Sequence, residues 1–399
     1  MGEAACGFPE MKLFGGAPRG HAGKDDGLEF GSCNLPVPGK DHDRQAYLRL
    51  GAAAPGEKIP PASLSSCLAF GLFDGHGVNA SVSELAASSL LPAISNASTD
   101  SSCSDLRSNS SSTSTRSNGS SSTLSSESGT DAVEVTVEDP EEEARASSLL
   151  ERASTLGQKR AERCLLAGFK HLSQKITTQF ESQRVGSTAT VILASRHTGS
   201  LPPVSGAKAA ATPAWDITCA WVGDSRAVLI GPYGHFERTL SEDHRLELPR
   251  EFDRVMAVQR AESGTCVKGE RTTVVAHRVC NSTGRQGPQV IFNEKTGVST
   301  MVTRTFGDSL GATALTDEPE LCSCSARAGS RIVICSDGVW DVMSHEKVAS
   351  LIKRVKNPRA AAKALCSAAK KARLYGGFST DDISAIVINL NDEKIRKPN

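Results

Sequence analysis

The stretch DITCAWVGDSRAVLIG, residues 216–231, consists of two apolar runs separated by the tripeptide Gly-Asp-Ser. Both runs are short and rich in β-branched residues, which is typical of strands in a pleated sheet. Glycine and aspartate between two strands are common turn residues. We therefore expect two strands in a hairpin-like arrangement, with the carboxylate of Asp224 at the turn.

Other segments extend this pattern in both directions along the chain. Strand-like runs are TATVILAS (188–195), RIVICSD (331–337) and DISAIVINL (382–390), and helical spacing of apolar residues recurs over 141–180, 345–356 and 358–374. Strands in succession with helices grouped between them favour antiparallel sheets covered by helices over an alternating βα fold. The sequence predicts an α+β sandwich.

Composition divides the chain into a core region and polar segments. Residues 1–39 are rich in Gly and Pro, and we expect a loose arm with one short edge strand. Residues 95–140 are dominated by Ser, Thr, Asn and Gly and contain too few apolar residues to offset the entropy of ordering, so we predict a disordered insert. The expected domain spans 40–392 around this insert, and 393–399 form a C-terminal tail.

The charge balance excludes some classes of partner. The 399 residues carry 45 basic and 45 acidic side chains, so no global positive field indicates nucleic acid or an anionic membrane surface. The 12 cysteines lack paired metal-ligand spacing, and no apolar leader or membrane-length run is present. We expect an intracellular protein of the cytoplasm, the nucleus or both.

Acidic residues occur where the apolar runs end or begin. Asp74 ends the apolar run of CLAFGLFDGHG (67–77), Asp337 ends RIVICSD, and Asp381 precedes the last run. Several carboxylates that converge from strand ends would suit Mg²⁺ or Mn²⁺, because these hard cations prefer oxygen ligands. Two such ions about 3.5 to 4 Å apart can activate a water molecule for attack on phosphorus.

Each of these residues also has a simpler explanation. An aspartate before glycine is a common turn residue that satisfies its own backbone, and Asp381 alone is explained as a cap or strand-entry residue. A lone His76 is more often an ordinary half-buried histidine than a catalyst. These explanations do not account for the joint occurrence and the order of the strings.

The ordered set of strings resembles the signature segments of the type 2C metal-dependent protein phosphatases (PPM family). The strings are FGLFDGHG (70–77), GSTATVILA (186–194), WVGDSRAVL (221–229), LSEDHR (240–245), TRTFGD (303–308), ICSDGVWDV (334–342) and STDDISAIVI (379–388). Seven dispersed motifs in order are far more specific than any one of them. The resemblance covers roughly residues 40–390 and implies a central sandwich of two antiparallel sheets flanked by helices.

The resemblance also implies an activity and a set of site residues. The family hydrolyses phosphoserine and phosphothreonine in proteins by attack of a water that bridges two Mn²⁺ or Mg²⁺ ions, with a third ion in some members, and its members are commonly monomeric. His76 resembles the general acid that protonates the leaving oxygen. Arg304 and Asp308 match a segment near the site, in supporting roles. The residues that match metal ligands are Asp43, Asp74, the Gly75 carbonyl, Asp224, Asp337 and Asp381.

The first motif, PGKDHDRQAY (38–47), departs from the family pattern. His42 occupies the position where a metal-binding Glu or Gln is usual, and no phosphate-binding Arg precedes it, so Lys40 or Arg44 would have to substitute. Asp382 replaces the usual Asn, which adds charge that either favours metal or repels phosphate. The region 254–300 matches a flap, and basic residues there either meet acidic substrates or are ordinary surface charges: Lys268, Arg271, Arg278 and Arg285.

The sequence is also compatible with two other functions. The altered first motif is compatible with a pseudophosphatase that retains the fold as a regulatory binding module. A metal-dependent phosphohydrolase acting on a small phosphorylated molecule is the second alternative, and a substrate panel separates it from a protein phosphatase.

Overall fold

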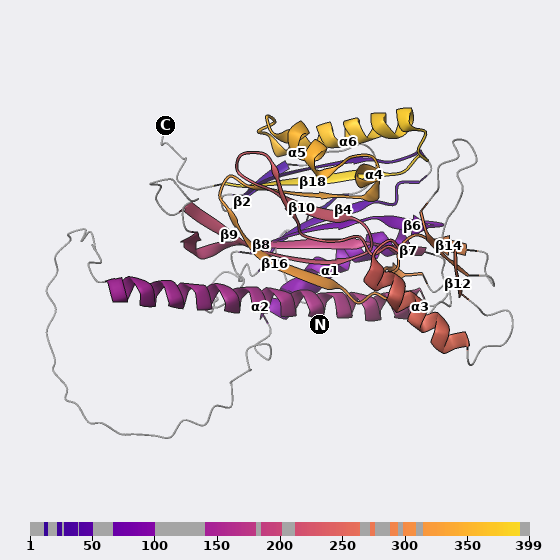
Figure 1. Ribbon diagram of the computed structural model, residues 1–399, viewed down its shortest axis with the longest axis horizontal. Helices are drawn as coiled ribbons and strands as arrows, with labels where there is room; N and C mark the ends of the chain where they lie inside the picture. Colours follow the sequence, from indigo (N-terminus) through magenta and orange to yellow (C-terminus); the bar gives the residue numbers. More distant parts are fainter. Residues whose placement is uncertain are drawn as a thin grey trace, which may run out of the picture.

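Two β-sheets lie against each other in the middle of the molecule, and helices cover the outer face of each sheet (Figure 1). A computed structural model describes residues 12–14, 22–25, 28–38, 40–50, 67–99, 140–180, 185–201, 212–263, 272–275, 288–293, 298–308 and 314–391. In Figure 1 the layers run from α5 and α6, through the two sheets, to α1 and α2 on the opposite side. Within the described residues, no helix combines the length and the apolar character needed to cross a membrane.

Both central sheets are antiparallel, and each has six strands among the described residues. The first sheet has the order β1 (Lys12–Phe14), β4 (Arg44–Arg49), β5 (Leu68–Phe73), β8 (Ala189–Leu201), β9 (Thr212–Val222), β16 (Glu320–Arg327). The second has the order β11 (Phe236–Thr239), β10 (Arg226–Ile230), β17 (Arg331–Cys335), β18 (Ile383–Leu390), β3 (Leu28–Leu35), β2 (Ala22–Asp25). The expected α+β fold with antiparallel sheets is confirmed.

Two small sheets and six helices complete the described elements. The small sheets are β12 (Thr272–Val275), β13 (Val290–Asn293), β14 (Val298–Thr300), and β15 (Phe306–Gly307), β7 (Val185–Ser187), β6 (Gly75–Gly77). The helices are α1 (Ser81–Thr99), α2 (Pro140–Gln179), α3 (Pro249–Ser263), α4 (Asp337–Trp340), α5 (His345–Ile352) and α6 (Pro358–Gly376).

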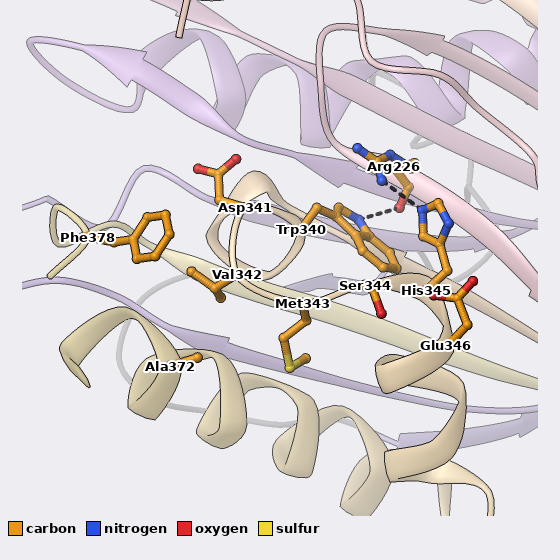
Figure 2. Close-up of a pocket in the computed structure, with 10 residues that line it drawn as sticks. All are labelled: Arg226, Trp340, Asp341, Val342, Met343, Ser344, His345, Glu346, Ala372 and Phe378. Atoms are coloured by element: carbon orange, nitrogen blue, oxygen red, sulfur yellow. Dashed lines mark hydrogen bonds between the residues drawn. The ribbon is translucent and has the colours of Figure 1, made fainter. Parts of the chain in front are cut away.

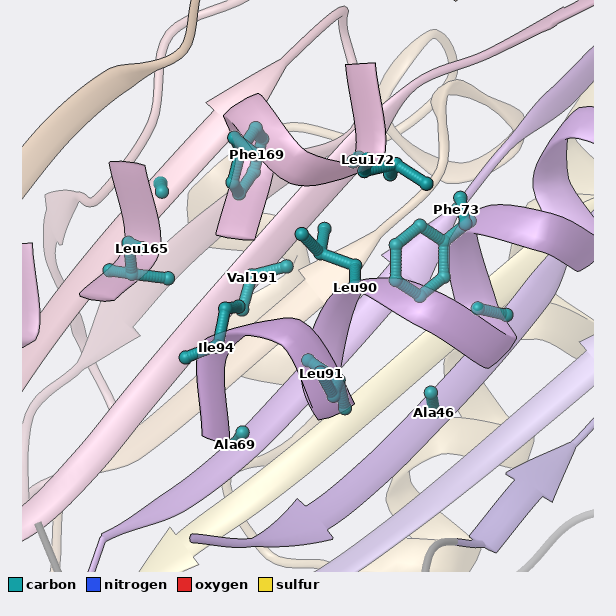
Figure 3. Packing of buried hydrophobic residues seen from close by; sticks show 14 of the residues in the cluster. Ala46, Ala69, Phe73, Leu90, Leu91, Ile94, Leu165, Phe169, Leu172 and Val191 are labelled. Atoms are coloured by element: carbon teal, nitrogen blue, oxygen red, sulfur yellow. The ribbon is translucent and has the colours of Figure 1, made fainter. Parts of the chain in front are cut away.

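Apolar side chains fill the three spaces between the four layers. The inter-sheet core includes Phe70 and Trp215, both about 1% exposed or less. Between the first sheet and its helices, Leu90 of α1 and Phe169 of α2 pack with Val191 of β8 (Figure 3). Burial of one such side chain contributes roughly 1.5 to 3 kcal/mol. The helical spacing of apolar residues from Ala161 to Ile176 therefore reflects one face of α2 turned toward the sheet.

The connection at 223–225 differs from the sequence-based expectation of a hairpin. The strand before it, β9, pairs with β8 and β16, whereas the strand after it, β10, pairs with β11 and β17. The chain thus passes from one sheet to the other at this point. Gly223 has φ +95°, and a Cβ there would lie 2.5 Å from a methyl carbon of Thr188, so the close crossing requires glycine.

The expected loose arm over 1–39 is wrong for its C-terminal third. Residues 28–35 form β3, which is buried and lies between β18 and β2 instead of at an edge. The sequence LEFGSCNL hides this strand because Gly, Ser, Cys and Asn interrupt its apolar pattern. The domain therefore begins before residue 40.

The insert and the flap are only partly described. Helix α1 continues through residues 95–99, where Ser98 is buried, so the polar insert begins later than residue 95. Residues 100–139 lie outside the described residues, as do the four basic flap residues Lys268, Arg271, Arg278 and Arg285. The described part of the 254–300 region contains most of α3 and the sheet β12–β13–β14.

Candidate metal centre

The strand register brings acidic residues of the first sheet together. Arg44 of β4 pairs with Phe73 of β5, so Asp43 and Asp74 lie one position beyond the last pair, on adjacent strands. The backbone N–H of Thr188 donates to the Asp74 carbonyl at 2.9 Å, which fixes the end of β5 against the start of β8.

The second sheet delivers further carboxylates at the same end of the sandwich. Cys335 at the end of β17 pairs with Arg226 at the start of β10 and with Ala385 near the start of β18. Asp224 precedes β10, Asp337 follows β17 and Asp381 precedes β18, so all three lie at one end of the sheet. The carboxylate cluster comprises Asp43, Asp74, Asp224, Asp337 and Asp381.

The electrostatics show that these carboxylates act on one another. Burial, followed by the charges of Asp43, Asp337, Asp381 and Asp224, raises the pKa of Asp74 well above its ordinary value. Burial and the charge of Asp224 likewise raise the pKa of Asp337. A group of carboxylates whose negative forms are disfavoured by burial and by one another is stabilised by a nearby cation.

Asp43 is the carboxylate whose surroundings most favour a bound cation. Its side chain is fully buried, and neither carboxylate oxygen has a hydrogen bond of normal geometry within the described part of the chain, although Ser384 and Asp74 lie near enough to act on its pKa. Burial and the charge of Asp382 raise its pKa to about 7. Because an unpaired buried carboxylate is costly and hard divalent cations prefer such oxygens, the cluster fits Mg²⁺ or Mn²⁺.

The segment before β4 is held by Asp382. The carboxylate of Asp382 accepts hydrogen bonds from the backbone N–H groups of Val37 and His42, each at 2.7 Å. Asp382 is 2% exposed, so its carboxylate does not face solvent. Its charge acts instead on the backbone segment that leads to Asp43.

The two basic residues of this segment have different roles. The guanidinium of Arg44 donates to the backbone carbonyls of Asp41 and Asp43 and pairs with Glu84, so its donors are directed away from the cluster. The ammonium of Lys40 pairs with Asp381 and lies within the field of the cluster. Of the two cations considered from the sequence, only Lys40 lies at the carboxylates.

His76 and Gly75 follow Asp74 on β6. A Cβ at Gly75 would lie 2.6 Å from the His42 carbonyl, so only glycine lets these backbones approach. The His76 Nε2 and an Asp308 carboxylate oxygen form a hydrogen bond. Burial lowers the pKa of His76, but the charge and the hydrogen bond of Asp308 outweigh it and raise the pKa.

Arg245 makes ion pairs with three aspartates at one side of the cluster. Its Nε lies 2.7 Å from Asp224, its Nη2 3.3 Å from Asp337 and its Nη1 3.2 Å from Asp341. Asp341, four residues after Asp337 in the same motif, also lies 3.5 Å from Arg373. Neither Arg245 nor Asp341 was predicted from the sequence, because their roles depend on contacts between distant segments.

A second group, His244, Glu251 and Glu320, brings its ligand atoms within 4.8 Å of one another. Burial raises the pKa of Glu251, but hydrogen bonds from Arg304, Thr303 and Arg254 outweigh it and lower the pKa to about 2. Arginines therefore already neutralise this group, including Arg304, which the sequence indicated for a supporting role near the site.

The histidine of that second group is also unsuited to bind a metal. His244 Nδ1 accepts the N–H of Gly223 at 3.1 Å, so in the neutral ring the proton is on Nε2, the atom that faces Glu320. We interpret the group as an ion-pair network that fixes α3.

An open pocket of about 490 Å³ adjoins Asp341. In Figure 2, Asp341 and Phe378 lie toward one end and Arg226 and His345 toward the other, with Trp340 between them. The indole N–H of Trp340 donates to the Arg226 carbonyl at 3.0 Å. The pocket thus lies beside the carboxylate cluster, because Asp341 shares Arg245 with Asp224 and Asp337.

Comparison with known proteins identifies the family. The family model described as "Protein phosphatase 2C" matches residues 136–374, more than half of the chain. The chain belongs to the protein phosphatase 2C family. Its relatives include the probable protein phosphatase 2C 9 of Arabidopsis thaliana, 35% identical over 88 residues, which are 22% of this chain and 30% of that protein.

Other phosphatase 2C relatives match over different lengths. The probable protein phosphatase 2C 61 of Arabidopsis thaliana is 26% identical over 189 residues, 46% of this chain and 53% of that protein. The matches to the first three curated relatives span 30%, 26% and 28% of their lengths.

Solved structures show the same fold. The serine-threonine phosphatase 2C of Toxoplasma gondii superimposes with a TM-score of 0.59 at 16% identity, over 95% of this chain and 99% of that one. A sex determining protein of C. elegans gives 0.55 at 18% identity, over 93% and 67%. At these identities the likeness extends to the fold alone.

Proposed function

We propose that this chain is a metal-dependent protein serine/threonine phosphatase whose metal centre is the carboxylate cluster. The observation that carries the proposal is the buried carboxylate of Asp43, whose two oxygens lack hydrogen bonds of normal geometry within the described residues, beside the raised pKa of Asp74. Family membership supports the reaction class. The proposed ligands are Asp43, Asp74, the Gly75 carbonyl, Asp224, Asp337 and Asp381.

Divalent ions, when bound, supply the acidification of the attacking water and offset the charge of the phosphate. Side chains of the protein bind the phosphate and protonate the leaving oxygen. Lys40, whose ammonium lies at Asp381, provides a positive charge for the phosphate oxygens in place of the arginine that the first motif lacks. Arg44 is engaged with backbone carbonyls and Glu84 and has no such role.

His76 is the proposed general acid. The raised pKa of His76 favours the protonated ring at neutral pH. In that ring Nε2–H donates to Asp308, and the Nδ1 proton is transferred to the serine or threonine oxygen as its bond to phosphorus breaks. Asp308 positions the ring, and Gly186 leaves room for the pair, because a Cβ at Gly186 would lie 2.3 Å from His76 Nε2.

The proposed substrates are phosphorylated proteins, and the pocket beside Asp341 has room for residues that flank the phosphorylated side chain. A monomer that acts in the cytoplasm or the nucleus remains part of the proposal. Hydrolysis assays with Mn²⁺ and with Mg²⁺ show which of the two ions the enzyme uses.

Hydrolysis of a phosphothreonine peptide by the purified chain tests the proposal. We expect turnover with Mn²⁺ or Mg²⁺, loss of turnover with EDTA, and a decrease of at least about 100-fold in Asp74→Asn and Asp337→Asn. The control is Asp253→Asn, an exposed aspartate on α3. Turnover that survives EDTA and both substitutions would contradict the metal-dependent mechanism.

The pseudophosphatase is the second candidate, and His42 at the position of the usual acidic ligand favours it. Metal-binding and hydrolysis measurements on the folded protein distinguish the two functions. Metal binding without turnover on a phosphothreonine peptide, a phosphoserine peptide and small phosphate esters would support the binding module. Turnover confined to the small esters would support a small-molecule phosphohydrolase.

A further inference from the structure

One side of the carboxylate cluster already contains a cation that belongs to the protein. The guanidinium of Arg245 contacts Asp224, Asp337 and Asp341 through three different nitrogens, at 2.7, 3.3 and 3.2 Å. A guanidinium has five N–H donors in a fixed plane, so it can bind several carboxylates at once. We call Asp224, Asp337 and Asp341 the acidic triad.

The backbone around Arg245 directs this side chain toward the triad. The N–H of His244 donates to the Gly223 carbonyl at 3.0 Å, which places Arg245 beside Asp224. On the other side, the N–H of Thr303 donates to the His244 carbonyl at 2.7 Å. The segment is therefore fixed on both sides, and the contact does not depend on a flexible surface loop.

Burial distinguishes Arg245 from an ordinary surface arginine. Its side chain is 15% exposed, whereas that of Arg250, which pairs with Glu242 and Glu320 nearby, is 45% exposed. Three carboxylates this close together without a cation would repel one another strongly in a partly buried site. With Arg245 in place, a divalent ion at the triad would face a fixed positive charge at short range.

We propose that Arg245 is a built-in cation that takes the place of an additional divalent ion at the acidic triad and thereby reduces the number of ions that the metal centre holds. The hydrogen bonds of Arg245 go to Oδ2 of Asp224 and Oδ2 of Asp337, so the second oxygen of each carboxylate stays available to the ligand set proposed above. The inference rests on the proposed function, because it concerns the number of ions that the same centre holds.

Counting bound Mn²⁺ tests the inference directly. Isothermal titration of the full chain, with electron paramagnetic resonance of the unbound Mn²⁺, gives the number of ions per chain. Arg245→Met removes the charge and keeps an apolar stem, so we expect one more ion per chain than in the wild type. Arg245→Lys keeps a positive charge and should bind the wild-type number. Arg250→Met is the matched control.

The extra ion should also depend on the triad. In the Arg245→Met background, Asp341→Asn should remove the additional ion, whereas Asp341→Asn alone should leave the wild-type number unchanged. This last variant retains Arg245 and tests the inference even if Arg245→Met does not fold. Loss of an ion in the Asp341→Asn single variant would overturn the inference, because Asp341 would then ligate metal in the presence of Arg245.

The outcomes separate this inference from the proposed function. The inference is overturned if the wild type binds Mn²⁺ and folded Arg245→Met binds the same number of ions per chain. The metal centre itself would remain supported by that result. A wild type that binds no Mn²⁺ would overturn the metal centre. In that case, one ion bound by Arg245→Met would still support the inference, and none would overturn it as well.

Discussion

At the scale of single residues, Asp308 combines an unusual backbone conformation with a contact to His76. Its φ is 48°, in the left-handed region that residues other than glycine rarely adopt, and such a conformation costs on the order of 1 to 3 kcal/mol. The backbone N–H of Asp308 donates to the Val185 carbonyl at 2.9 Å, which holds the residue in this conformation. The carboxylate is thereby directed at the ring of His76.

Asp308→Asn tests whether this carboxylate tunes the proposed general acid. Asparagine tolerates the left-handed region about as well as aspartate, so the substitution removes the charge without adding backbone strain. Because Asp308 raises the pKa of His76, its loss lowers that pKa. The alkaline limb of the kcat profile, where His76 loses its proton, should move to lower pH, and kcat at pH 8 should fall roughly 10- to 100-fold.

An unchanged alkaline limb in Asp308→Asn would contradict the assignment of His76 as the acid. Asp253→Asn, which removes an exposed carboxylate of α3, serves as the control for the loss of one negative charge.

Asp382→Asn tests a structural role at a second single residue. In asparagine an NH2 group, which only donates, replaces one of the two oxygens that each accept an N–H, and hydrogen bonds to charged groups contribute about 1.5 to 3 kcal/mol. We expect the free energy of unfolding to fall by about 1 to 3 kcal/mol, measured by urea denaturation. A stability equal to that of the wild type would show that Asp382 does not hold the 37–42 segment.

At the scale of elements, a network of ion pairs joins α3 to the strands beside the site. Glu251 of α3 is 1% exposed and pairs with Arg304 at 2.6 Å and Arg254 at 2.9 Å. Arg304 also pairs with Glu320 of β16 at 2.8 Å. The helix is therefore attached to the first sheet through buried charges as well as apolar contacts.

The contribution of Glu251 should depend on pH. Its pKa is about 2 in the folded chain against an ordinary value of 4.5, so the stabilisation is fully present above about pH 4.5 and is lost as the pH falls toward 2. Glu251→Gln should destabilise the chain by on the order of 2 to 3 kcal/mol at pH 7. Urea unfolding at pH 7, 4 and 3 measures whether the difference from the wild type shrinks with acidity.

The control for Glu251→Gln is Glu318→Gln, at an exposed position of the same region. A difference between Glu251→Gln and the wild type that stays constant from pH 7 to pH 3 would contradict the folded-state pKa of about 2.

The sequence predicts the helices and strands whose apolar residues follow a regular helix or strand pattern. The β-branched runs around 189–194, 217–222 and 331–335 appear as strands, and 141–180 appears as one long helix. Helix α1 was not predicted, because SVSELAASSLLPAISNAST is rich in serine and contains Pro92. Its helical state follows from packing of Leu90 and Ile94 against α2 and the sheet, a tertiary effect that local propensity does not contain.

In the candidate site, too, local patterns could be predicted from the sequence and contacts between distant segments could not. Aspartates at strand ends could be predicted because a carboxylate after an apolar run is visible in one sequence segment. The pairing of His76 with Asp308 and of Arg245 with the acidic triad joins segments far apart in the chain, and no local pattern indicates it. The sequence also presented 223–225 as a hairpin because the sheet to which each strand belongs is not encoded locally.

At the scale of the whole molecule, the four layers depend on their apolar interfaces. Phe169 of α2 is 1% exposed and contacts Phe306 beside the site, with ring centroids 5.6 Å apart. Phe169→Ala should lower the free energy of unfolding by about 3 to 5 kcal/mol, whereas Leu374→Ala, at a position 75% exposed, should change it by less than about 0.5 kcal/mol. Similar values for the two variants would contradict this layered core.

Anomalous scattering of Mn²⁺, in crystals of the full chain soaked with this ion, tests most directly whether the carboxylate cluster is a metal centre. We expect manganese peaks beside Asp43, Asp74 and Asp381, with the guanidinium of Arg245 still at the acidic triad. Manganese bound instead at His244, Glu251 and Glu320, or no manganese at Asp43 and Asp74 in crystals that bind the ion elsewhere, would contradict this expectation.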